Sequence, residues 1–288
     1  MRVGVGLPAA VPGVDATIIG EWAAGAEENG FASLGVFDRL VYDNLEPLTV
    51  LAAAAARTVR VELLTTVLTV GWRNNPMLLA KQMASLDLLS GGRLTAGLGL
   101  GGWPDDFDAS EVPSSGKGAR LEQILAMMRK VWAGELQGQG GPTRRLPEGR
   151  PALLFGGLVP AAYRRAAIHA QGWVSPLFGL ETLEGGTAAV RKAWADAGRP
   201  GEPRIVTGRY VSFGRNADAV ADEYVHHYYG DEFFAAARAD TMTSSEQVTR
   251  GLEQLAAAGA TDVVLYPCSA ELEQIELLAA VSRSPSGP

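Results

Sequence analysis

The chain has 288 residues, 47% of them hydrophobic and 20% charged, with a formal net charge of −7. Such a chain can bury a full hydrophobic core, which excludes a disordered protein and a disulfide-stapled mini-protein. The negative charge repels a phosphate backbone, so we expect no nucleic-acid partner. A single cysteine, Cys268, no secretory leader pattern and no uncharged apolar span predict a cytoplasmic protein without membrane attachment.

Short β-rich runs alternate with helical patterns along the first half of the chain. Strands are expected at residues 2–7, 32–37, 60–69 and 93–99, and helices from about residues 15, 47, 75 and 119. Asn75 and Pro76 are a strong helix start, because Asn caps a helix and Pro suits its first turn. Two segments rich in turn residues, 101–118 and 134–150, are expected to be loop insertions.

The second half continues the alternation. Strands are expected at residues 151–155, around 173, at 204–213 and at 262–266. One helix is expected to begin at Pro160 and a second to end near Gly198. A third is expected from Asn216 to about Gly230, and a fourth from a capping box at 243–246 to Gly259. The last helix is expected to start after a cap at Ser269. Eight strands, each followed by a helix, favour an α/β fold of one (β/α)8 TIM barrel over a doubly wound sheet, with residues 1–288 as a single domain.

Chemistry in a TIM barrel is located where the strands end at their carboxyl side. None of those stretches contains a histidine, and His169, His226 and His227 all fall within predicted helices. A histidine-based metal site and a Ser-His-Asp triad therefore have no support, and we expect no metal. No P-loop pattern is present either.

Two glycine clusters follow predicted strands. In residues 97–103, missing side chains would let a flat ring approach the backbone, although close strand packing explains alternating glycines equally well. In residues 155–160, a strand end meets a helix start, where free N–H groups suit a phosphate; a plain tight turn is the simpler interpretation.

These segments resemble the bacterial luciferase-like monooxygenase family, which comprises flavin- or F420-dependent oxidoreductases built on a TIM barrel. The resemblance is strongest over residues 79–93 and 97–101, and further matches occur at 26–31, 118–122, 160–167 and 256–267. It therefore spans nearly the whole chain. The family resemblance also implies a homodimer.

The resemblance implies a cofactor in the barrel mouth, either reduced FMN or F420. The ring would lie against Thr65, Thr66 and Val67 and against Gly99, Leu100 and Gly101, with a cis peptide near Thr66-Val67 in F420-using members. The phosphate end would lie at Gly156, Gly157, Leu158 and Val159, in the loop that ends at Ala162. Arg120, Arg164 or Arg165 would be its cationic partner, and a solvated helix face is the alternative for these arginines.

The chain departs from the family pattern at three places, one of which is Gln171, where relatives often have Asp. Many members have Asp-His after the second strand, whereas this chain has Asp38-Arg39, which we take as the catalytic candidates; a surface ion pair is the alternative. A guanidinium cannot act as a base but can stabilise an anionic oxygen or reduced flavin. Many members also carry two serines where this chain has Leu158 and Val159, so hydroxyl donors are lost there.

The candidate substrate-binding residues are aromatic: Phe37, Trp103 and Tyr228. Loop aromatics near a mouth often form pocket walls, although a helical tyrosine is commonly part of a core. The first hypothesis is a monooxygenase that uses reduced FMN to oxygenate a small organic substrate. A separate flavin reductase would supply the reduced FMN. The alternatives are F420-dependent hydride transfer and a non-catalytic subunit that binds a ligand or a partner chain.

Overall fold

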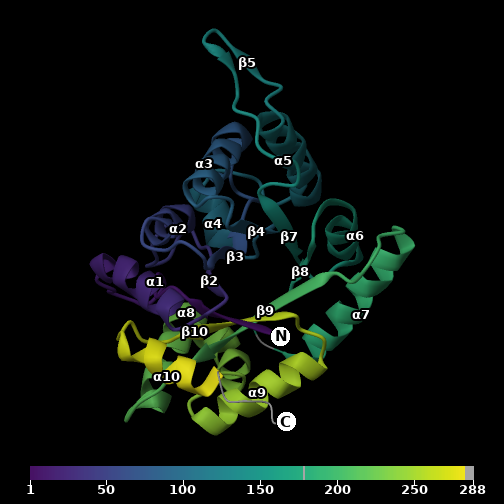
Figure 1. The fold of residues 1–288 in the computed structure, drawn as a ribbon. Coiled ribbons are helices and arrows are strands. Elements are labelled where there is room, and N and C mark those ends of the chain that lie inside the picture. The colour runs from purple at the N-terminus through teal and green to yellow at the C-terminus, as the bar shows by residue number, and fades with distance from the viewer. Residues whose placement is uncertain (178, 283–288) are drawn as a thin grey trace.

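Eight parallel strands close into a barrel in the computed structural model of the chain, which describes residues 1–177 and 179–282 (Figure 1). The barrel strands are β1 (Arg2–Gly6), β2 (Ser33–Val36), β3 (Glu62–Thr69), β4 (Leu94–Gly99), β7 (Ala152–Gly156), β8 (Gly172–Val174), β9 (Arg204–Val211) and β10 (Asp262–Pro267). Each strand pairs with its neighbours in the order β1, β10, β9, β8, β7, β4, β3, β2. This closed parallel barrel with interleaved helices confirms the predicted fold class.

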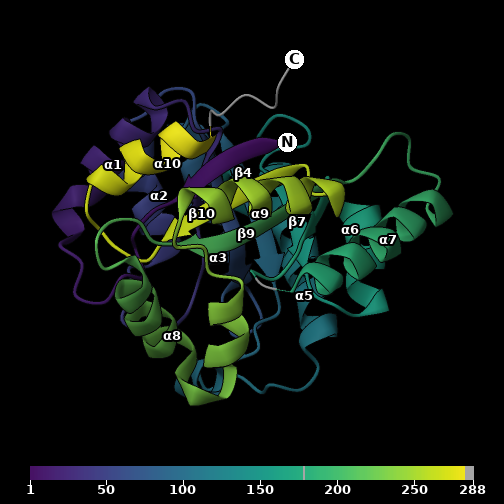
Figure 2. The same cartoon turned by 90° about the horizontal axis from the view of Figure 1, so that it is seen from below.

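The helices lie around the outside of the barrel (Figures 1 and 2). They are α1 (Ile19–Glu28), α2 (Pro47–Ala55), α3 (Pro76–Leu89), α4 (Pro104–Ala109), α5 (Lys117–Trp132), α6 (Pro160–His169), α7 (Leu180–Asp196), α8 (Ala217–Ala239), α9 (Ser245–Ala257) and α10 (Glu273–Ser282). Within the described residues, none of these helices is both long enough and apolar enough to cross a lipid bilayer.

Helix α3 illustrates how the sequence sets an element. The Asn75 side chain accepts the Leu78 N–H at 2.9 Å, and Pro76 occupies the first helical position, as predicted. Residues on one face, Leu79, Met83 and Leu86, are buried against the barrel. The cap and the apolar stripe together fix where α3 begins and which face it buries.

The barrel has two buried apolar layers. One lies between the strands and the outer helices; there Trp22 of α1 donates its indole N–H to the Gly6 carbonyl at 3.1 Å. The other lies inside the barrel and includes Leu64, Leu154 and Val264. A Cβ at Gly35 would lie 2.5 Å from the Val264 side chain, so this strand position needs a glycine.

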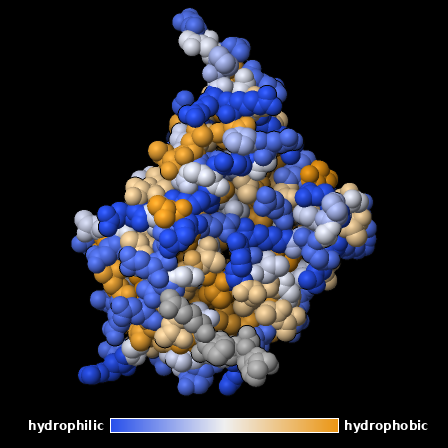
Figure 3. All heavy atoms as spheres, in the orientation of Figure 1, coloured by the Kyte–Doolittle hydropathy of each residue, from blue (hydrophilic) through white to orange (hydrophobic). Residues whose placement is uncertain are grey.

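Five expectations at the loops and helix ends are corrected by the structure. The segment 101–118 contains α4, because Pro104 sits at its first turn with Asp105 and Asp106 behind it. The segment 134–150 contains a hairpin of β5 (Gln137–Gly138) and β6 (Gly141–Pro142), which projects from the barrel with a hydrophilic tip (Figures 1 and 3).

Helix α8 does not end near Gly230 but resumes after it and continues to Ala239. Gly230 has a φ of 61°, which bends the helix into two segments that meet at a sharp angle (Figure 2). The last helix begins at Glu273, and the Ser269 hydroxyl instead accepts the Glu271 N–H in the preceding turn. The capping box before α9 is shifted by one residue, to Ser244 and Gln247.

Candidate active site

A cavity of about 370 Å³ opens where β2, β3, β4 and β7 end at their carboxyl side. Twelve of the residues proposed from the sequence line it: Phe37, Asp38, Thr66, Val67, Gly99, Leu100, Gly101, Trp103, Gly156, Gly157, Val159 and Tyr228. We call it the mouth cavity. Its size falls within the roughly 300–1,000 Å³ of small-molecule pockets.

Four proposed residues lie outside the lining of the mouth cavity. Thr65 is buried and donates its hydroxyl to the Gly97 carbonyl at 2.8 Å, whereas Leu158 is half exposed. Arg120 donates to the carbonyls of Gly71 and Pro113 at 2.7 and 2.9 Å, so its guanidinium fixes loops instead of facing the phosphate position. Arg39, the fourth, is described below.

Asp38 is a buried carboxylate at the edge of the mouth cavity. Its Oδ2 accepts the Thr69 N–H at 2.9 Å and an Arg73 N–H at 3.0 Å. Burial raises the pKa of Asp38 to about 6, and the opposing pull of Arg73 and the Thr69 N–H does not cancel it. A carboxyl group with this pKa can take up or release a proton near neutral pH.

Arg39 points away from the mouth cavity, toward α4. Its guanidinium pairs with Asp105 at 3.0 Å and with Asp106 at 3.4 Å, and its side chain is only 5% exposed. The expected alternative of a surface pair between Asp38 and Arg39 is therefore wrong, because each is buried and has its own partner. The Arg39 guanidinium also lies 4.0 Å from the centre of the Trp103 ring, a cation–π contact that positions this tryptophan.

An aromatic wall closes one side of the mouth cavity. Phe37 and Tyr228 meet edge to face with ring centres 5.3 Å apart, and Trp103 lies 6.1 Å from Tyr228. Tyr229, the next residue of α8, completes the wall at 4.7 Å from Tyr228. Burial raises the pKa of Tyr228 and that of Tyr229, so both phenols stay protonated.

Three further lining residues were missed: Thr69, Pro176 and Leu177. Arg73, which holds Asp38, was missed because nothing local in the sequence joins two residues 35 positions apart. Tyr266 is hydrogen-bonded through its hydroxyl to Thr66, and its place at the end of the last strand was the available signal. The Thr66-Val67 peptide is cis, as the family resemblance implied.

The rim glycines serve strand packing as well as the cavity. A Cβ at Gly99 would lie 2.4 Å from the Val67 side chain, and one at Gly101 would lie 2.5 Å from Thr69. A Cβ at Gly102, in contrast, would meet no atom within 4 Å. The close-packing interpretation therefore accounts for Gly99 and Gly101, while Gly102 borders open space at the cavity.

The start of α6 offers a position for a phosphate group. Gly157 has a φ of 119°, which only glycine adopts readily, and Trp173 holds its carbonyl through a hydrogen bond of 2.9 Å. Leu158 and Val159 are both about half exposed, so they do not block the route from the cavity to the helix start. The residues present therefore fit a flat ring with a phosphate tail: backbone and small side chains for the ring, a helix N-terminus for the tail.

The closed parallel barrel has a cavity at the carboxyl ends of its strands, which is where TIM-barrel enzymes carry their active sites. The family model described as "Luciferase-like monooxygenase" matches residues 1–265, and the chain belongs to this family. It is an oxidoreductase family that includes monooxygenases and F420-dependent enzymes.

Parts of the chain are similar in sequence to curated proteins. An uncharacterized protein of Mycobacterium tuberculosis is 31% identical over 172 residues, covering 56% of this chain and 60% of the relative. An F420-dependent glucose-6-phosphate dehydrogenase of Amycolatopsis mediterranei is 34% identical over 124 residues, covering 40% of this chain and 37% of the relative. The chain thus spans less than two thirds of the length of these curated relatives.

The fold is shared more widely than the sequence. The monooxygenase RslO1 of Streptomyces bottropensis superimposes with a TM-score of 0.78 at 22% identity, covering 98% of this chain and 97% of that one. At this identity the likeness shows the fold alone.

Proposed function

We propose that this chain is an F420-dependent oxidoreductase that transfers a hydride between the deazaflavin and a small uncharged alcohol or ketone. The observation that carries the proposal is Asp38, a carboxyl group with a pKa of about 6 beside an aromatic cavity. Oxidation of an alcohol requires a group that accepts the hydroxyl proton, and Asp38 is suited to that role.

The order of the two cofactors rests on the relatives. The sequence alone favoured reduced FMN as the cofactor and left F420 as the alternative. Two relatives, at 34% and 30% identity over parts of the chain, are named F420-dependent glucose-6-phosphate dehydrogenases, which supports F420. A monooxygenase such as RslO1 shares the fold only, so it adds no support for FMN and a flavin reductase.

The chain's own residues have distinct tasks in this proposal. Backbone around Gly99 and Gly156, with the Val67 side chain, would hold the ring, and Gly157 with the start of α6 would hold the phosphate. F420 supplies a ring carbon that accepts or donates a hydride. When an alcohol is oxidised to a carbonyl compound, Asp38 would accept the hydroxyl proton.

The second oxygen of Asp38 is available for that proton. Oδ2 is occupied by Thr69 and Arg73, whereas Oδ1 has no hydrogen-bond partner among the described residues. Arg73 keeps the carboxylate oriented when it is charged, and the aromatic wall excludes water from the substrate. Asp38 would thus be the proton-transfer group, and Arg73 a positioning residue.

The lining of the mouth cavity also limits the substrate. No Lys, Arg or His is among its described lining residues. A phosphorylated sugar carries charge that such a cavity cannot neutralise, so the substrate of the Amycolatopsis relative does not fit well here. A compact alcohol or ketone with an apolar body fits better.

Anaerobic titration with F420 and, separately, with FMN tests the proposal. We expect saturable F420 binding, followed by F420 reduction when members of a panel of small apolar alcohols are added. FMN binding with oxygen uptake after reduction would favour the monooxygenase and contradict the proposal. Failure of both cofactors to bind would favour the non-catalytic alternative.

Three further expectations remain predictions: the homodimer, the cytoplasmic location and the single-domain organisation of residues 1–288. Light scattering coupled to size-exclusion chromatography tests the first. Limited proteolysis tests the last, because a single domain should yield no stable half-barrel fragment.

A further inference from the structure

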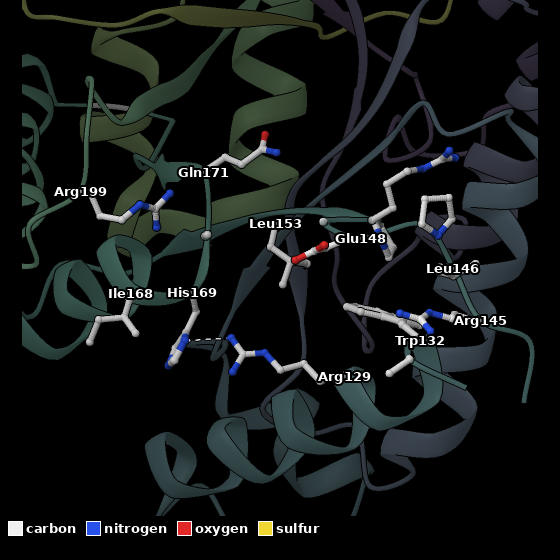
Figure 4. Close-up of a pocket in the computed structure, with 16 residues that line it drawn as sticks. Arg129, Trp132, Arg145, Leu146, Glu148, Leu153, Ile168, His169, Gln171 and Arg199 are labelled. Atoms are coloured by element: carbon white, nitrogen blue, oxygen red, sulfur yellow. Dashed lines mark hydrogen bonds between the residues drawn. The ribbon is translucent and has the colours of Figure 1, made fainter. Parts of the chain in front are cut away.

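A second cavity, of about 790 Å³, lies at the opposite end of the barrel from the mouth cavity. It is a groove between α5 and α6, where β7 and β8 begin (Figure 4). We call it the arginine groove, and its cationic side chains are Arg129, Arg145, Arg150 and Arg199. It shares no lining residue with the mouth cavity.

Most of the positive charge in the arginine groove is unpaired. Arg150 pairs with Asp87 at 2.9 Å, but within the described residues Arg129, Arg145 and Arg199 have no carboxylate partner within 4 Å. Glu148 is the one acidic residue in the described lining. The helix C-termini of α5 and α6 add roughly half a negative charge each, which does not offset three arginines.

This concentration is notable in a chain whose net charge is −7. A concave surface lined by one sign of charge focuses the field and attracts a ligand of the opposite sign. The groove is thus an attractive region for an anion on a molecule of negative net charge.

His169 lies inside this cluster. An Arg129 N–H donates to its Nδ1 at 2.9 Å, so Nδ1 carries a lone pair and the imidazole is neutral. Burial lowers the pKa of His169, and Arg129 and Arg165 lower it further against the opposing effect of Glu122. An anion bound beside Arg129 would favour the protonated imidazole of His169. The pKa of His169 would therefore rise when an anion binds in the groove.

Apolar side chains form another part of the groove. Trp132 and Leu153 are nearly buried, and Ile168 is 59% exposed on the opposite side. The Trp132 indole donates to the Ala80 carbonyl at 2.9 Å, which fixes the ring in place. Figure 4 shows the bonded Arg129 and His169 on one side of the groove and Trp132 with Arg145 on the other.

We propose that the arginine groove binds an organic anion with a flat apolar body, in which a carboxylate or phosphate is joined to an aryl or acyl group. The arginines would hold the anionic group through charge-assisted hydrogen bonds. The Trp132 face and Leu153 would cover the apolar body. Neither F420 nor FMN enters this argument, so the proposal does not depend on the proposed function.

Titration of the protein with 2-naphthoate, followed by the imidazole proton signals in NMR spectra, tests the proposal. We expect the His169 signal to shift saturably and the pKa of His169 to rise, while the signals of His226 and His227 on α8 stay in place. Acetate lacks the apolar body and 2-naphthylmethanol lacks the charge, so each should bind at least about tenfold more weakly. Equal binding of the neutral alcohol, or no shift at His169, would overturn the proposal.

Two adjacent arginines provide a matched pair of variants. Arg145 lines the groove, whereas Arg144 is exposed and does not line it. Arg145→Gln should weaken 2-naphthoate binding about fivefold, since it removes a charge-assisted contact, and Arg144→Gln should leave it unchanged. An equal loss in both variants would mean general charge attraction and would contradict a built site.

Discussion

The two ends of the barrel interior handle buried carboxylates in opposite ways. At the amino end of the strands, Glu62 and Asp262 both pair with Arg204 at 2.7 Å. At the mouth, Asp38 has a single contact from one guanidinium and one backbone N–H. Burial acts to raise the pKa of all three carboxyl groups. For Glu62 and Asp262 the arginines lower the pKa by more than burial raises it, whereas for Asp38 the effect of burial is larger.

The outcome is a division between stability and chemistry. The pKa of Glu62 and that of Asp262 are lowered, so both carboxylates stay charged and hold the strands together. The pKa of Asp38 is raised to about 6, so this carboxyl group can exchange its proton. Asp38, the carboxyl group with the raised pKa, lies at the end of the barrel where TIM-barrel enzymes carry out their chemistry.

The largest expected effect is on turnover. Asp38→Asn should lower kcat/KM for F420 reduction by about 10²- to 10⁴-fold, because it removes the proton acceptor while keeping the shape of the side chain. The matched control is Glu46→Gln, since Glu46 also contacts Arg73, at 3.4 Å, from outside the mouth cavity. Equal losses in both variants, or a fully active Asp38→Asn enzyme, would remove Asp38 from the mechanism.

The paired charges at the amino end should instead govern stability. Arg204→Met removes one of the two arginines that Glu62 and Asp262 share and leaves them only the half-exposed Arg2, so it should lower the free energy of unfolding by about 3 kcal/mol in urea denaturation. Arg191 pairs with Glu202 at the exposed surface, so Arg191→Met should cost less than about 1 kcal/mol. Similar costs for the two variants would contradict the stabilising role of the Arg204 cluster.

The two ends should also differ in how stability depends on pH. Native Asp38 holds its proton up to about pH 6, whereas its ordinary pKa is 3.8. Between these values the native state binds more protons, so the contribution of Asp38 to the free energy of unfolding falls as pH rises, and the loss is complete above pH 6. Glu62 and Asp262, with lowered pKa values, contribute stability at neutral pH that is lost in acid.

Asp38→Asn should therefore gain about 2 kcal/mol in unfolding free energy relative to the original chain between pH 4 and pH 7. Urea denaturation at the two pH values measures this difference. A difference that does not change with pH would mean that the Asp38 pKa is not raised in the native state.

A smaller effect is expected at the rim of the mouth cavity. Gly102→Val should weaken F420 binding about tenfold, because the new side chain enters open space beside the cavity and disturbs no packed neighbour. Gly185→Val on α7 is the control, since a Cβ there also meets no atom within 4 Å. Unchanged F420 affinity in Gly102→Val would argue against the mouth cavity as the cofactor site.

Local signals in the sequence predicted most of the barrel. The Asn75-Pro76 start of α3 and the short strand at Trp173 are properties of a few adjacent residues, and the structure confirms both. Helix α4 was missed because a six-residue helix among glycines and aspartates has too little apolar periodicity to identify. The continuation of α8 past Gly230 was missed because glycine normally ends a helix.

The site was less accessible to sequence reasoning than the fold. The position of Asp38 at a strand end was readable, but its partner Arg73 and the partners of Arg39 come from distant segments. Arg39 lies 66 positions from Asp105, and only the folded barrel brings the two together. Whether a charged residue faces the cavity or a neighbouring helix is decided by such contacts.

The pH dependence of F420 reduction in a single turnover tests the central claim most directly. With the alcohol that the panel identifies, the rate should rise with pH with an apparent pKa of about 6. This step should vanish in Asp38→Asn and persist in Glu46→Gln, where it moves to lower pH because the Glu46 charge helps to raise the pKa of Asp38. A rate without that step, or the same step in Asp38→Asn, would contradict the assignment of proton transfer to Asp38.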